Sequence, residues 1–120
     1  MLINDFFSLR ELKHSNHSIE AVVSFKEDHS IFKGHFEGFP VVPGVCMMQL
    51  IKEILEKELD KKFMLSKAAN MKFLTVIDPR KNKEVHANIE YNPNGSNTID
   101  FEAKLFSGET IFFKLKAHLV

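Results

Sequence analysis

Residues 34–45 combine a histidine, several glycines and prolines, and the start of a helix. The imidazole of His35, with an ordinary pKa of about 6.5, can accept a proton at neutral pH. The first backbone N–H groups of a helix have no helical partner, so Gly44 can donate to a carbonyl oxygen that becomes negative. Glycine there also permits close approach by a ligand. A base beside such a donor is suited to removing a proton next to a thioester carbonyl, whereas the plainer interpretation is a loop histidine with a local hydrogen bond.

The backbone N–H of Gly44 can play this role only if a helix begins directly after Pro43. Proline is well tolerated in the first helical turn, and the sequence from there to about Leu59 has helical periodicity. Its wide apolar arc comprises Cys46, Met47, Met48, Leu50, Ile51, Ile54 and Leu55. Gln49, Lys52, Glu53 and Glu56 occupy the remaining polar arc. An apolar arc this broad predicts a helix that is covered on most sides.

Alternating and β-rich segments predict six strands around this helix. Residues 6–23 form two strands separated by a turn at 14–17, and further strands are expected at 63–76, 84–91, 98–106 and 110–119. Asn94-Gly95 and Ser107-Gly108 are hairpin turn signals. The pattern predicts an α+β fold, a single domain over residues 1–120 in which one helix covers one antiparallel sheet. The exposed face or edge that remains favours a homodimer.

Composition excludes several function classes. The 120 residues carry 16 basic and 16 acidic side chains, so the chain lacks the positive charge excess of nucleic-acid-binding proteins. Twelve Phe, one Tyr and no Trp predict an apolar interior or tunnel. The single Cys46 cannot form an intramolecular disulfide, and no signal sequence or membrane span is recognisable. A soluble, cytoplasmic protein is expected, with Cys46 a small buried apolar residue.

The run His35-Phe36-x-Gly38-x-Pro40-Val41-Val42-Pro43-Gly44-Val45 resembles the signature of the β-hydroxyacyl-acyl carrier protein dehydratases. The resemblance implies the hotdog fold, in which one curved antiparallel sheet wraps around a long central helix. It implies that His35 is the catalytic base and that the N–H of Gly44, next to Val45 at the substrate-binding turn, polarises the thioester carbonyl. It also implies a catalytic acid on the helix of the partner protomer, at the position of Gln49.

Two positions depart from this family pattern. Gln49 stands where these dehydratases have Glu or Asp, and an amide can donate a hydrogen bond but cannot deliver a proton. Loss of general-acid assistance typically costs about 10²- to 10⁴-fold in rate. Glu37 stands where the family usually has an uncharged residue. Glu37 and Glu53, one helical turn beyond Gln49, are alternative acids, although the plainer interpretation of both is a solvated surface carboxylate.

Three functions remain open at this stage. The first is a lyase of fatty-acid or related acyl-chain synthesis that dehydrates β-hydroxyacyl thioesters, with Phe36, Phe39 and Met48 lining an acyl tunnel. The second is a hotdog thioesterase, and the third is an accessory subunit that pairs with an active paralogue. The first implies docking of the phosphopantetheine arm of an acyl carrier protein and a homodimer or larger assembly of dimers. No cofactor, metal or nucleic acid is expected. Basic side chains that suit an acidic carrier protein are Lys33, Lys62, Arg80, Lys81 and Lys83.

Overall fold

The computed structural model describes residues 1–33, 40–95 and 97–120. In chain order the elements are β1 (Phe7–Ser15), β2 (Ser18–Phe25), the 3-10 turn η1 (Ser30–Phe32), α1 (Gly44–Leu59), β3 (Leu65–Phe73), β4 (Val85–Pro93), β5 (Ile99–Ser107) and β6 (Thr110–Leu119). All six strands predicted from the sequence are present, and the helix has the predicted end. The short turn η1 was not predicted, because three residues give no periodic signal.

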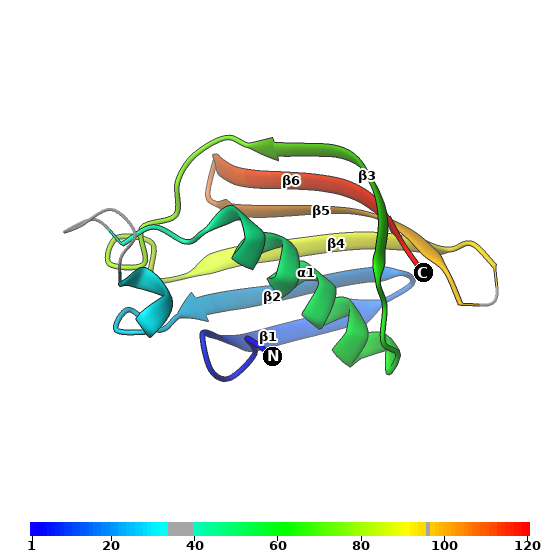
Figure 1. The fold of residues 1–120 in the computed structure, drawn as a ribbon, viewed down its shortest axis with the longest axis horizontal. Coiled ribbons are helices and arrows are strands. Elements are labelled where there is room, and N and C mark those ends of the chain that lie inside the picture. The colour runs from blue at the N-terminus through cyan, green and yellow to red at the C-terminus, as the bar shows by residue number, and fades with distance from the viewer. Residues whose placement is uncertain (34–39, 96) are drawn as a thin grey trace.

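The six strands form one antiparallel sheet in the order β1-β2-β4-β5-β6-β3. Figure 1 shows α1 lying across one face of this sheet, with β1 at one edge and β3 at the other. The predicted turn at Ser107-Gly108 joins β5 to β6, and Gly108 adopts a φ of 57°, which glycine tolerates without strain. The α+β prediction and the single antiparallel sheet are confirmed.

Helix α1 is shorter than the long central helix that the resemblance implied. It contains 16 residues, or about 24 Å at the standard rise per residue. It begins directly after Pro43 and ends at Leu59. The next residue, Asp60, has a left-handed backbone (φ 51°), and its N–H donates to the carbonyl of Glu56. Within the described ranges, no helix has the length and apolar character to cross a membrane.

The hydrophobic core lies between α1 and the sheet face that it covers. Leu50, Ile51, Ile54 and Leu55 are fully buried on the helix. Along β5, buried and exposed residues alternate, with Leu105 inside and Lys104 outside, as expected for a sheet with one covered face. Most of the described phenylalanines are core residues, namely Phe6, Phe7, Phe25, Phe32, Phe63, Phe101, Phe112 and Phe113.

The polar arc predicted for the helix is not uniformly solvated. Glu53 is fully buried, in contrast to the solvated carboxylate that was the plainer interpretation, and Glu56 is 8% exposed. At Glu56, the segment that follows the helix folds back, and the N–H of Phe63 donates to its carboxylate at 2.8 Å. Burial of a carboxylate is tolerated when such donors replace water. Helical periodicity could not predict this, since the covering segments lie outside the helix.

Candidate functional site

The N-terminus of α1 offers free backbone donors. Pro43 precedes the helix without a side-chain cap, and the first turn contains no acidic residue. The N–H groups of Cys46 and Met47 both donate to the carbonyl of Pro43, at 3.0 and 3.2 Å. The N–H groups of Gly44 and Val45 have no acceptor among the residues that the structure describes. This end of the helix can therefore donate to a carbonyl or carboxylate oxygen.

Two contacts fix the position of this helix end. The N–H of Val42 donates to the carbonyl of Ile77 at 2.9 Å, and both residues are buried. The ring of Phe73, at the end of β3, lies against Gly44 so closely that a Cβ there would stand 2.6 Å from Phe73 Cε1. A side chain at position 44 would therefore displace the Phe73 ring, a contact that the sequence could not reveal.

Gln49 is half-buried on α1, five residues beyond Gly44, or about 7.5 Å further along the helix axis. Its side-chain Nε2 donates to Oε2 of Glu53 at 2.9 Å. Val45, on the same side of the helix, is 71% exposed. Gln49 is therefore positioned by a neighbour one turn away.

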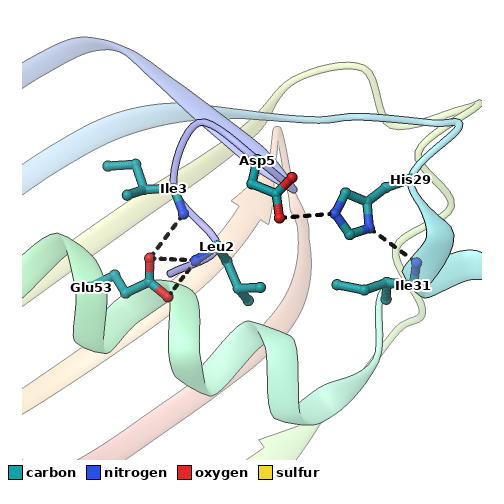
Figure 2. Close-up of polar contacts among 6 residues, drawn as sticks. All are labelled: Leu2, Ile3, Asp5, His29, Ile31 and Glu53. Carbon is teal, nitrogen blue, oxygen red and sulfur yellow. Dashed lines mark hydrogen bonds and ion pairs between the residues drawn. The ribbon is translucent and has the colours of Figure 1, made fainter.

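Glu53 is held by the N-terminus of the chain (Figure 2). The N–H of Leu2 lies 2.9 Å from both carboxylate oxygens of Glu53, and the N–H of Ile3 lies 2.9 Å from Oε1. The chain before β1 therefore folds over the helix and buries this carboxylate. Sequence reasoning missed this contact, because backbone donors leave no signature in residue type.

The same N-terminal segment is tied to η1. Nε2 of His29 lies 3.2 Å from Oδ2 of Asp5, and Nδ1 of His29 accepts the N–H of Ile31 at 3.0 Å, capping the turn. The His29 ring also packs edge-on against Phe6. Since η1 ends at Phe32, the anchored turn leads in sequence into the segment that contains His35. His29 was not singled out from the sequence.

The other predicted site residues divide into two groups. His35, Phe36, Glu37 and Phe39 lie outside the described residues, so their predicted roles stay predictions. Met48 is half-buried and packs against the core. Cys46 is buried as predicted, and burial raises the pKa of its thiol. Among the described ranges, no cluster of three or more histidine, cysteine or acidic side chains could hold a metal ion.

A second polar cluster lies near the last turns of α1, away from Gly44. His14 contacts Oε1 of Glu58 through Nδ1 at 3.1 Å and the Tyr91 hydroxyl through Nε2 at 2.6 Å. The pKa of Tyr91 is raised, mainly by burial and to a smaller extent by the nearby negative charge of Glu58. The predicted turn at 14–17 is present, but His14 belongs to this cluster, which links α1 to two strands.

Comparison with known proteins identifies a family for this chain. The ApeI-like family model, described as ApeI dehydratase, matches residues 11–112. A relative from Rickettsia bellii, the 3-hydroxyacyl-[acyl-carrier-protein] dehydratase FabZ, is 30% identical over 83 residues. That match covers 62% of this chain and 57% of the relative, so the chain spans little more than half of the length of this curated relative.

Solved structures share the fold. The dehydratase heterocomplex ApeI:P from Xenorhabdus doucetiae aligns with a TM-score of 0.68 and 17% identity, over 92% of this chain and 95% of that chain. A candidate thioesterase from Ralstonia eutropha, described as related to phenylacetic acid degradation, aligns with a TM-score of 0.62 and 11% identity, over 90% and 81% of the two chains. These likenesses concern the fold alone. The family model spans most of the chain, and this chain belongs to the ApeI-like dehydratase family, within the FabZ and ApeI group of hotdog dehydratases.

Proposed function

We propose that this protein dehydrates β-hydroxyacyl thioesters carried by an acyl carrier protein. The observation that carries the proposal is the uncapped start of α1, where the N–H of Gly44 has no acceptor among the described residues. A backbone donor at a helix N-terminus suits a thioester carbonyl that gains negative charge when the neighbouring carbon loses a proton. Membership of the dehydratase family supports the same chemistry.

In the proposed reaction, His35 removes a proton from the carbon next to the thioester carbonyl. The carbonyl oxygen becomes more negative and is stabilised by the N–H of Gly44. The bond from the β-carbon to its hydroxyl then breaks, leaving a 2-enoyl thioester. The hydroxyl takes up one proton and leaves as water, so that one substrate gives one enoyl product and one water.

Gln49 determines how fast the last step runs. Its amide can hold the hydroxyl or a water but has no acidic proton to give. The proton must therefore come from the imidazolium of His35, from solvent, or from an acid on another chain. A slow enzyme is expected for a chain acting alone, and a faster one if a paralogue supplies a carboxylic acid at the equivalent helix position. The heterocomplex formed by the structural neighbour ApeI:P makes such pairing worth testing.

The free edge of the sheet supports association with a second hotdog chain. Almost every residue of β3 is exposed, and β3 has no strand on its outer side within the described part of the chain. Next to it, large apolar side chains are exposed at Val45, Phe73, Leu74 and Val76. An unpaired edge strand flanked by exposed apolar residues favours pairing with another strand. We propose a homodimer through β3, in which each chain completes the site of the other.

An assay of the pure protein tests the proposal. The protein is incubated with a β-hydroxyacyl thioester of acyl carrier protein, and the enoyl product is measured by mass spectrometry. We expect slow enoyl formation that His35→Ala abolishes. Undiminished dehydration by His35→Ala contradicts the assignment of the base. Release of free acid instead indicates the thioesterase reaction, and turnover that appears only with an added paralogue indicates the accessory role.

A further inference from the structure

The contact with Glu53 determines which end of the Gln49 amide faces the carboxylate and which end faces away from it. Carboxylate oxygens accept hydrogen bonds, and the carbonyl oxygen of an amide also only accepts. The 2.9 Å contact between Glu53 Oε2 and the Gln49 side chain therefore requires the N–H end of the amide to face the carboxylate. The amide oxygen, Oε1 of Gln49, then lies on the side away from Glu53.

The carboxylate itself is locked in place. Glu53 is fully buried, and the backbone N–H groups of Leu2 and Ile3 donate to its oxygens (Figure 2). Because backbone donors at fixed positions hold both oxygens, the carboxylate has little freedom to rotate or to leave the helix surface. Engagement at both oxygens also favours anchoring over proton delivery as the role of Glu53.

We propose that Glu53 is a positioning residue that holds Gln49 with its amide oxygen directed toward the substrate. Gln49 then accepts a hydrogen bond from the β-hydroxyl of the substrate and orients that hydroxyl for departure. This inference rests on the proposed dehydration, and it reverses the expectation that Gln49 acts as a donor to the hydroxyl. The N-terminal segment becomes part of the site's support, since it holds the carboxylate that holds the amide.

Glu53→Gln is the informative variant, because glutamine has nearly the same shape and can still accept a backbone N–H. Because its amide oxygen accepts the N–H of Ile3, its NH2 group faces Gln49, and Gln49 must turn its own oxygen toward position 53 and its N–H end away. We expect kcat to fall by about 10- to 100-fold with little change in KM, as misplacement of a reacting group typically costs. The matched control is Glu56→Gln, since Glu56 is also buried on α1 and accepts a backbone N–H but does not contact Gln49 in the described structure.

The exchange variant Gln49→Glu/Glu53→Gln supplies a rescue. In it, the amide at position 53 donates to the new carboxylate at position 49, so the contact is restored with the roles reversed. We expect its activity to exceed that of Glu53→Gln. The side-chain amide protons of Gln49, followed by NMR, give a readout independent of catalysis: hydrogen exchange is slow in the unmodified protein and in Glu56→Gln, and fast in Glu53→Gln.

The outcomes separate the two proposals. If the unmodified protein shows no dehydration, the proposed function fails, and the NMR exchange rates still decide whether Glu53 orients Gln49. If the protein is active and Glu53→Gln loses no more activity than Glu56→Gln, the positioning role is wrong. Equal hydrogen-exchange rates of the Gln49 side-chain amide in Glu53→Gln and Glu56→Gln overturn the positioning role as well. A selective loss of kcat and of amide protection in Glu53→Gln supports it.

Discussion

Gly44→Ala distinguishes two reasons for a glycine at the start of α1. The sequence suggests close approach by a ligand, whereas the structure places the Phe73 ring there. A Cβ at position 44 would lie 2.6 Å from Cε1 and 2.8 Å from Cζ of Phe73. Carbon atoms in contact are usually about 3.5–4.0 Å apart, so the ring must retreat by roughly 1 Å. The substitution therefore acts first on Phe73.

The expected change in stability is small because two effects oppose each other. Phe73 packs against Phe113 with ring centroids 4.9 Å apart, and loss of such a pair costs about 0.5–1.5 kcal/mol. Phe73 is 55% exposed, so its displaced ring can move into solvent at limited further cost. Alanine in place of glycine stabilises a helix by about 0.5–1 kcal/mol. We therefore expect Gly44→Ala to change the unfolding free energy by less than about 1 kcal/mol.

A double-mutant cycle with Phe73→Ala isolates the contact. In the Phe73→Ala background the new methyl group meets no ring, so Gly44→Ala should stabilise the protein by about 0.5–1 kcal/mol. The expected coupling energy is about 1 kcal/mol, measured by urea unfolding at two protein concentrations to account for association. Activity is measured in parallel, since alanine keeps the backbone N–H. Equal effects of Gly44→Ala in both backgrounds would refute the steric role of Phe73. They would favour close approach by a ligand as the reason for glycine at position 44.

Two further predictions concern pH. Because the pKa of Tyr91 is raised in the folded protein, the unfolded chain loses the phenol proton at a lower pH than the folded protein does. This difference contributes in full to the free energy of unfolding below about pH 10, and the contribution is lost as the pH rises through the raised pKa. Tyr91→Phe should reduce the fall in unfolding free energy at alkaline pH. It should also remove the phenolate absorbance change, since the chain has one tyrosine. An unchanged fall in unfolding free energy excludes Tyr91 as its source. The raised pKa and burial of Cys46 predict slow alkylation by iodoacetamide at pH 8 and fast alkylation in urea. Equal labelling rates in both conditions contradict a buried thiol.

The elements that position the site could be predicted because their signals are local. The strands β4, β5 and β6 alternate buried and exposed residues along most of their length, and turn glycines separate them. Pro43 marks the start of α1, since proline is favoured in the first turn of a helix and a regular element cannot run through the segment before it. These patterns follow from the periods of strands and helices and need no knowledge of tertiary contacts.

The support of the site could not be predicted, because it depends on segments distant in sequence. Glu53 is separated by about 50 residues from the backbone N–H groups that bind it, and these groups belong to Leu2 and Ile3, whose side chains suggest no polar role. His14 and Glu58 are 44 residues apart. Periodicity describes one element at a time, so it cannot show which distant segment pairs with a polar side chain.

The locations of Gln49 and Glu53 explain why a single chain carries an amide at the position that we propose for the acid. Their contact of 2.9 Å leaves no room for two carboxylates unless they share a proton or separate. The backbone donors of Leu2 and Ile3 favour the negative group at position 53, where water is excluded. The amide is therefore the compatible neighbour at position 49. A partner chain that supplies an acid at the equivalent of position 49 must then carry a neutral residue at the equivalent of position 53, which gives a sequence criterion for choosing the paralogue to add in the assay.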